Sequence, residues 1–286
     1  MTIAYLKLTR FPLVFTAAAD SAVGAALSGC DLLHSGAWIP AVICSSLLYA
    51  AGMVLNDLVD IERDRTIHPE RPLPSGRVGI RTAYNFAGIL FVLALAVSGL
   101  GGLATVAWTG GIAGLIHAYN LALKRNAAAG SAGMALIRGA NLGLGAVVAG
   151  ASSGDVILPW APMAILAGYV FFLTLWSTRE EKPGRGREAL AAAGAGMILV
   201  PLAGLALPRP MGWPLVAAPL WILPWVLRAL VRPDANRLMQ AVRWGVLGII
   251  PLDASFLAAQ GRWMEAAAVA GLLIPALALL PLFRKL

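Results

Sequence analysis

The chain has 286 residues, of which 59% are hydrophobic and only 13% are charged, and its net charge is +8 at pH 7. Soluble globular domains contain about one quarter charged residues, so this composition excludes an ordinary soluble protein. The positive charge does not indicate nucleic-acid binding, because the basic residues lie between apolar runs and not on one face of a soluble module.

Ten apolar runs follow one another along the chain. Each has about the 20 residues that a helix needs to cross the hydrocarbon core of a bilayer. Because no stretch is left for a soluble domain, we expect a single membrane domain over residues 1–286. The predicted fold is an all-α, polytopic transmembrane bundle of nine to ten spans. The runs cover residues 11–29, 37–55, 80–100, 103–121, 133–151, 158–177, 189–207, 212–231, 241–259 and 264–282.

The basic residues are distributed unevenly between the two sides of these spans. If the N-terminus is cytoplasmic, 19 Lys and Arg residues fall in inside segments, 2 fall outside, and Arg138 lies within a span. The positive-inside rule therefore predicts a multi-pass protein of the cell (inner) membrane, with both termini in the cytoplasm. The first run reaches full spanning length, which predicts a helix and not a cleaved signal. Cys30 and Cys44 indicate neither a disulfide framework nor a metal site.

The loop after the second span contains a regular set of oxygen ligands. Asn56, Asp60 and Asp64 are four residues apart, so on a helix they share one face. Such oxygens suit Mg²⁺, which takes one or two carboxylates together with substrate phosphates and water. Cations follow at Arg63, Arg65, Arg71 and Arg77. Carboxylates for a metal beside guanidiniums for phosphate oxygens predict a diphosphate site, whereas a solvated helix cap explains only single acids.

This loop carries a family resemblance. The pattern Asn56-x3-Asp60-x3-Asp64, followed by Arg71-Pro72-Leu73-Pro74-Ser75-Gly76, resembles the first signature of the UbiA family of intramembrane prenyltransferases. The similarity extends to Arg10-x-Pro12 at the first helix and to Tyr119-Asn120-x3-Lys124-Arg125 after the fourth.

The resemblance implies a role for each matching residue. Asn56, Asp60 and Asp64 would hold Mg²⁺ on a prenyl diphosphate. Arg71 and Lys124 would neutralise the leaving diphosphate, and the side chain of Tyr119 would line the cavity near it. Metal and fixed cations would stabilise the negative charge that ionisation puts on the diphosphate. An apolar tunnel would shield the carbocation from water.

The family's second signature, a DxxxD pair, is missing from the loop after the sixth span. Residues 177–188 contain no carboxylates spaced by four, and Pro183-Gly184 interrupts any helix there. Glu180 or Glu181 remains a candidate ligand for one ion, and Arg179 a candidate for phosphate; a basic cytoplasmic loop with incidental acids is the alternative. This departure, together with Arg138-Gly139-Ala140-Asn141 in the fifth span, is similar to the divergent UbiA-like proteins linked to Ebo-type operons.

Several polar residues lie inside the predicted spans, where ionisable groups are costly and indicate function. Asp20 would contact the acceptor or form a salt bridge with Arg138, since buried charges are normally paired. Arg138 and Asn141 are further substrate-binding candidates, although Arg138 could also extend toward the cytoplasmic phosphates. For Asp253 a packing or pairing role is expected.

These observations predict Mg²⁺-dependent transfer of a prenyl group from a prenyl diphosphate to a lipophilic or amphipathic acceptor in the membrane. Membrane lipid would surround the protein, and no nucleic acid would take part. One alternative is a non-catalytic or transport protein that binds an isoprenoid phosphate, since the second motif is degenerate. Another is a CDP-alcohol phosphotransferase, but its signature requires a Gly and an Ala-Arg pair that Asp57-Leu58-Val59-Asp60 lacks.

Overall fold

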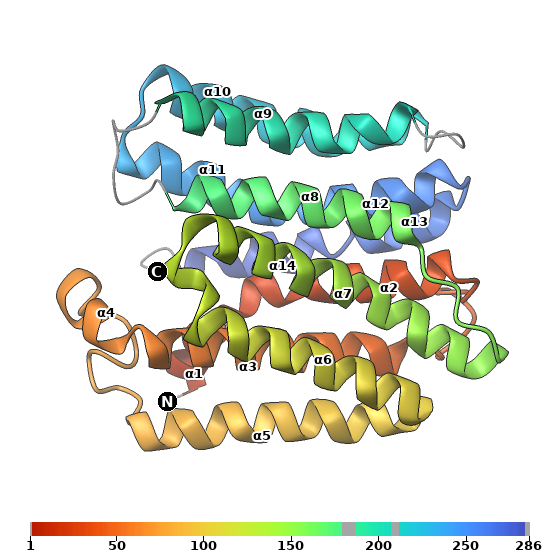
Figure 1. Ribbon diagram of the computed structural model, residues 1–286, viewed down its shortest axis with the longest axis horizontal. Coiled ribbons are helices and arrows are strands. Elements are labelled where there is room, and N and C mark those ends of the chain that lie inside the picture. The colour runs from red at the N-terminus through yellow and green to blue at the C-terminus, as the bar shows by residue number, and fades with distance from the viewer. Residues whose placement is uncertain (1, 179–186, 207–211, 284–286) are drawn as a thin grey trace.

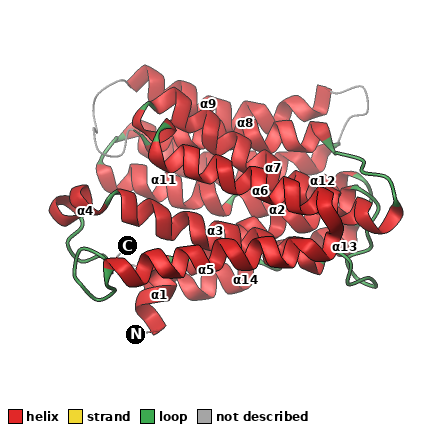
Figure 2. Ribbon diagram, turned by 60° about the horizontal axis from the view of Figure 1, so that its bottom comes forward, coloured by secondary structure: helices red, strands yellow, loops and turns green. Residues whose placement is uncertain are grey.

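The computed structural model describes residues 2–178, 187–206 and 212–283. The described residues form helices joined by loops and contain no strand, and most of the helices run alongside one another with the loops gathered at the two ends (Figures 1 and 2). The helices are α1 (Thr2–Leu8), α2 (Val14–Leu27), α3 (Ile39–Val59), α4 (Ile61–Ile67), α5 (Ile80–Ser98), α6 (Gly102–Leu121), α7 (Ala127–Ser153), α8 (Trp160–Ser177), α9 (Arg187–Ala203), α10 (Ala217–Val231), α11 (Ala235–Leu247), α12 (Ile249–Ala259), α13 (Trp263–Ala270) and α14 (Leu273–Leu279).

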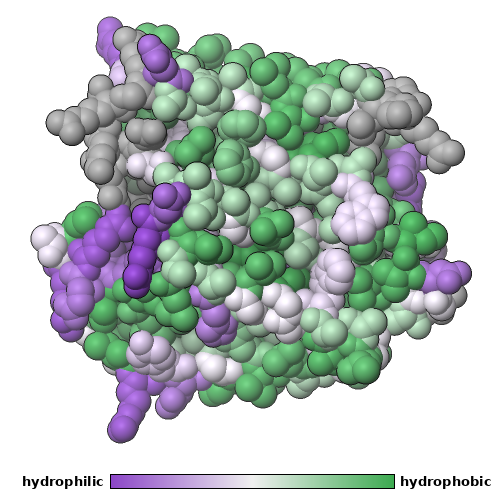
Figure 3. Space-filling model, viewed as in Figure 1, coloured by the Kyte–Doolittle hydropathy of each residue, from purple (hydrophilic) through white to green (hydrophobic). Residues whose placement is uncertain are grey.

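The helices have the length and composition of membrane spans. Within the described residues, seven helical segments are long and apolar enough to cross a membrane, and one of them combines α5 and α6. Residues 11–27 and 263–279 form shorter apolar helices. Each of the ten predicted runs therefore coincides with helix, and the all-helical membrane fold is confirmed. Apolar side chains cover the middle of the face in Figure 3, and many of the polar ones gather near the end where α4 lies.

The predicted span at 241–259 differs from the structure in two respects. The helix begins six residues earlier, at Ala235, where the side chain of Asp234 accepts a hydrogen bond from the Arg237 N–H. It also breaks at Gly248 into α11 and α12. Pro251 follows this break, and a proline removes a helical hydrogen bond and clashes with the carbonyl four residues earlier.

Helix α7 lies at the centre of the bundle, where it packs on α2, α6 and α8. Its first turn is capped by Asn126, whose side chain accepts hydrogen bonds from the N–H groups of Ala128 and Ala129. The crossing of α7 with α2 depends on glycine. A Cβ added to Gly24 would lie 1.8 Å from the carbonyl oxygen of Leu142, so the two backbones approach as closely as small residues allow.

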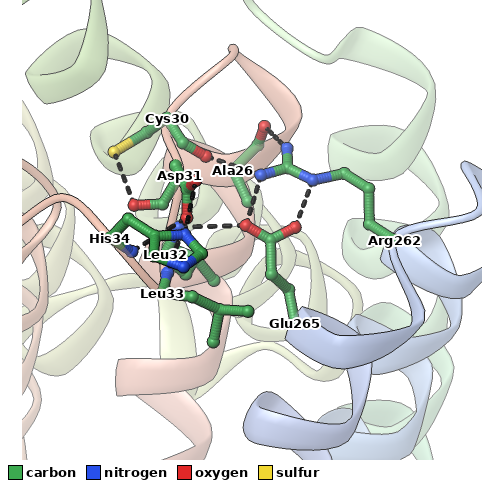
Figure 4. A network of polar contacts seen from close by, with 8 residues as sticks. All are labelled: Ala26, Cys30, Asp31, Leu32, Leu33, His34, Arg262 and Glu265. Carbon is green, nitrogen blue, oxygen red and sulfur yellow. Dashed lines mark hydrogen bonds and ion pairs between the residues drawn. The ribbon is translucent and has the colours of Figure 1, made fainter.

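The end of the bundle opposite α4 is closed by what we call the Arg262–Glu265 clamp (Figures 1 and 4). Arg262, which directly precedes α13, donates to the carbonyl oxygens of Ala26 and Cys30, the latter at 2.7 Å, and pairs with Glu265. Glu265 Oε1 also accepts a hydrogen bond from the Leu32 N–H at 2.9 Å. The clamp therefore joins the α2–α3 loop to the start of α13.

The α2–α3 loop contains a second, exposed set of polar contacts. Asp31 Oδ1 accepts hydrogen bonds from the N–H groups of Leu33 and His34, and its Oδ2 lies 3.0 Å from His34 Nδ1. These contacts, of which the one with the His34 side chain is the strongest, hold the pKa of Asp31 below its usual range. Burial raises the pKa of the neighbouring Cys30 thiol.

Candidate active site

Two oxygen atoms of the first motif lie close to the same cation. Lys124 Nζ is 2.7 Å from Asp60 Oδ1 and donates a hydrogen bond to Asn56 Oδ1 at 3.1 Å. Asn56 belongs to the last turn of α3 and Asp60 follows that helix, while Lys124 comes from the short 3₁₀ helix Leu123–Arg125 after α6. Segments distant in sequence thus place an ammonium group between two oxygen ligands.

The predicted helical register of the motif persists through a break in the helix. Helix α3 ends at Val59 and α4 begins at Ile61, with Asp60 between them. The Asp60 N–H nevertheless donates to the Asn56 carbonyl at 3.0 Å, and the Asp64 N–H donates to the Asp60 carbonyl at 2.8 Å. The spacing of four residues is therefore kept, although the three side chains do not share one partner.

Asp64 pairs with an arginine from the loop that follows. Arg71 Nη1 donates to Asp64 Oδ2 at 2.6 Å, and Asp64 is 2% exposed. The loop is folded back on itself, because Ser75 Oγ donates to the Arg71 carbonyl and the Val78 N–H donates to the Pro72 carbonyl. The short Arg-Pro-Leu-Pro-Ser-Gly segment thereby orients the Arg71 guanidinium toward the carboxylate.

A second ion pair at this end was not predicted. Arg10 Nη2 lies 3.4 Å from Asp57 Oδ1. Arg10 is also the only non-glycine residue with positive φ among those described, at 47°. Such a conformation costs about 1–2 kcal/mol and persists only where the surroundings impose it. Asp57 lies in the motif but off the four-residue spacing; an acid adjacent to Asn56 was the available signal.

A cavity of about 190 Å³ opens beside these residues. Its walls come from the segment before α2 and from α2, α3, α6 and α7. Asn56, Arg10 and Tyr119 lie in the wall on the side of the first motif, which confirms that Tyr119 lines a cavity near that motif. Apolar side chains such as Leu48 and Ile116 line the middle. The cavity therefore joins a charged mouth to an apolar interior.

The remaining predicted site residues fall into three groups. Asp20, Arg138 and Asn141 meet inside the bundle, where Arg138 forms the predicted ion pair with Asp20 at 3.0 Å and does not extend to the motif. Arg63 is exposed on α4. The three candidates of the second loop, Arg179, Glu180 and Glu181, lie outside the described residues.

The oxygen ligands of the first motif fit Mg²⁺ only together with a substrate. Among the described residues, no group of three or more His, Cys, Asp or Glu side chains forms a complete metal site. Asn56 and Asp60 direct oxygens toward one cation, and Asp64 lies one turn further on. This donor set suits an ion whose coordination is completed by phosphate oxygens and water.

The fold and this site define a multi-pass helical membrane protein with an acidic, cation-binding mouth on an intramembrane cavity. The model of the UbiA prenyltransferase family matches residues 13–232. The chain belongs to the UbiA prenyltransferase family, as the first motif predicted.

Known relatives and solved structures agree with this assignment. The digeranylgeranylglyceryl phosphate synthase of Sulfolobus acidocaldarius is 31% identical over 172 residues, which cover 60% of this chain and 60% of that relative's length. A UbiA homologue from Aeropyrum pernix K1 has the same fold, with a TM-score of 0.68 and 19% identity over 86% of this chain and 97% of that one. A homologue from Archaeoglobus fulgidus, bound to GPP and Mg²⁺, has a TM-score of 0.55 and 17% identity over 90% and 99% of the two chains.

Proposed function

We propose that this protein transfers a prenyl group from a prenyl diphosphate to a lipophilic or amphipathic acceptor within the membrane. The observation that supports the proposal most directly is the convergence of Asn56 and Asp60 on one cation at the mouth of the cavity. The Archaeoglobus homologue was solved with a prenyl diphosphate and Mg²⁺, which supports the same ligands here.

Each charged group of the mouth has a role in this proposal. Asn56, Asp60 and Asp64 hold Mg²⁺ on the diphosphate, and the bound ion would neutralise charge on the phosphate oxygens. Lys124 and Arg71 then exchange their carboxylate partners for diphosphate oxygens. The bond between the prenyl C1 and the diphosphate oxygen breaks with its electron pair on the diphosphate. The acceptor atom forms the new bond to C1 and releases a proton.

The relatives suggest the first acceptor to test. Because the Sulfolobus protein is named as a synthase of digeranylgeranylglyceryl phosphate, a glyceryl phosphate with a single geranylgeranyl chain is the natural starting compound. The basic residues of the mouth and of the neighbouring segments support the proposal that this end of the bundle faces the cytoplasm.

The test is binding of geranylgeranyl diphosphate to the purified, detergent-solubilised protein with Mg²⁺ and with EDTA. We expect at least tenfold tighter binding with Mg²⁺, because the carboxylates repel the diphosphate when no metal lies between them. Equal affinity in EDTA would contradict the metal site. Metal-dependent binding without turnover across an acceptor panel would favour a non-catalytic isoprenoid-phosphate protein.

A further inference from the structure

Four polar side chains from three helices form a cluster inside the bundle: Asp20 of α2, Arg138 and Asn141 of α7, and Asp253 of α12. Arg138 Nη2 donates to Asp20 Oδ1 at 3.0 Å. Asn141 Nδ2 donates to Asp20 Oδ2 at 2.9 Å and to the Ala17 carbonyl at 3.0 Å. Asp20 and Asp253 are both 0% exposed, so the cluster is shielded from both water and lipid.

Asp253 is the unusual member of this cluster. It faces Asp20 and Arg138, yet both of its oxygens are buried and form no hydrogen bond with the described residues. It also lies beyond residues 13–232, the part of the chain that the family model matches. An ionisable residue in the membrane interior is costly and indicates a function. Its position behind the Arg138–Asp20 pair connects α12 to the cavity wall.

Arg138 and Asn141 form part of that wall. Both hydrogen bonds of the Asn141 Nδ2 point away from the cavity contents, to Asp20 and to the Ala17 carbonyl. The reverse orientation of the amide would place its oxygen against the Asp20 carboxylate, so Asp20 fixes which end is the acceptor. The Oδ1 of Asn141 receives no hydrogen bond from a described residue. The wall therefore offers a hydrogen-bond acceptor at this point.

The charges of the cluster determine what can bind there. The one guanidinium of Arg138 is already paired with Asp20, and Asp253 adds a second carboxyl group. No surplus positive charge remains for an anion. The mouth differs, because Arg10, Arg71 and Lys124 lie there within reach of one another's carboxylate partners. An anionic group thus belongs at the mouth and a neutral one at the cluster.

The two places are well separated within the same cavity. Asn56 and Ser45 both line it and are eleven residues apart on α3, which corresponds to about 16 Å of helix rise. Ser45 lies beside the cluster, since its hydroxyl donates to the Ala17 carbonyl that also accepts from Asn141. A group bound at the cluster is therefore distinct from the diphosphate.

We propose that the Asp20–Arg138–Asn141–Asp253 cluster recognises a neutral hydroxyl group of the acceptor through Asn141 Oδ1, and that Asp253 is the positioning residue of this site. The inference rests on the proposed prenyl transfer and adds the chemical class of the acceptor. Asp253 acts through Asp20 and Arg138, whose orientation fixes the amide of Asn141.

The first experiment compares two probes on the purified protein: geranylgeranylglycerol, which has two hydroxyl groups, and its dimethyl ether, which has none. We expect the wild-type protein to bind the diol about tenfold more tightly, the discrimination that one hydrogen bond supplies. In Asn141→Leu the preference falls to within twofold. Equal binding of the two probes by the wild-type protein would overturn the proposal without the use of any variant.

Two variants at one position test the positioning role. Asp253→Leu removes the polar group behind Arg138, and we expect it to lower the diol preference at least fivefold. Asp253→Asn keeps the shape and is neutral, as suits a site whose single guanidinium is already paired, so it retains the preference. A preference that survives both Asn141→Leu and Asp253→Leu would overturn the proposal, and an equal loss in Asp253→Asn and Asp253→Leu would overturn the positioning role.

Mg²⁺-dependent binding of geranylgeranyl diphosphate is measured in parallel on every variant. Because the donor binds at the mouth, we expect its affinity to stay within twofold of wild type, which also reports that the variants fold. Loss of donor binding in the wild-type protein would contradict the proposed function itself. Intact donor binding without diol preference would contradict only the hydroxyl site.

Discussion

The two ends of the bundle use similar charged residues for different purposes. At the mouth, carboxylates pair with cationic side chains from distant segments, as Asp60 does with Lys124 and Asp64 with Arg71. At the opposite end, Arg262 and Glu265 also bond to main-chain atoms of the α2–α3 loop (Figure 4). Main-chain partners hold the fold together, whereas paired side chains beside a cavity are able to exchange one another for a ligand.

This contrast predicts opposite consequences of charge removal at the two ends. Loss of a carboxylate at the mouth should abolish ligand binding with little effect on stability. Loss of a charge from the Arg262–Glu265 clamp should lower stability without a change in ligand affinity. Variants that failed to separate in this way would show that the two networks do the same work.

The largest effect is expected for Asp60→Ala. It removes the carboxylate that shares a cation with Asn56, so Mg²⁺-dependent binding of geranylgeranyl diphosphate should fall on the order of 100-fold, the loss typical when a group that stabilises charge in an active site is removed. Direct binding to the purified protein measures it. The melting temperature should change little, because Asp60 and Lys124 are both partly open to solvent.

Glu62→Ala is the matched control in the same loop. Glu62 is exposed and pairs only with its neighbour Arg65 at 2.7 Å, a surface contact of small consequence. Donor affinity should therefore remain within twofold of wild type. Wild-type donor affinity in Asp60→Ala, or an equal loss in Glu62→Ala, would contradict the assignment of the metal-binding oxygens.

The next largest effect is expected for Glu265→Ala, this time on stability. Glu265 is 6% exposed and accepts from Arg262 and from the Leu32 N–H. Its loss leaves buried donors without a partner and should lower the free energy of unfolding by about 2 kcal/mol. Thermal unfolding in detergent measures the change. Donor affinity at the far mouth should be unchanged, and exposed Glu188→Ala serves as the control.

The sequence predicted those features that depend on local pattern. Apolar runs located all ten spans, because a run of spanning length has few alternatives to a membrane helix. The spacing of Asn56, Asp60 and Asp64 located the acidic end of the site. The start of α11 was placed too late, because Asn236 and Arg237 reduce the apolar character of a turn that is nonetheless helical.

Features that depend on tertiary contact could not be predicted in the same way. Asp20 and Arg138 are 118 residues apart, so their pairing remained one of two alternatives. The position of Asp253 depends on how α12 packs against α2, which no local pattern specifies. The left-handed backbone of Arg10 likewise gave no signal, since it is imposed by the surrounding structure and not favoured by arginine itself.

The smallest effect is expected from Asp31, whose contacts lie beside the clamp but outside it. Its hydrogen bonds with His34 and Leu33 lower the pKa of its carboxyl group in the folded protein. The ionised form therefore stabilises the fold above the unfolded pKa of about 3.9, and this contribution is lost as the pH falls through the lower, folded value. The melting temperature of Asp31→Asn should lie slightly below that of wild type at pH 6, and the difference should shrink below pH 3.9. A difference as large as that of Glu265→Ala would show that the exposed loop belongs to the clamp, and a difference that grew with acidity would contradict the direction of the pKa shift.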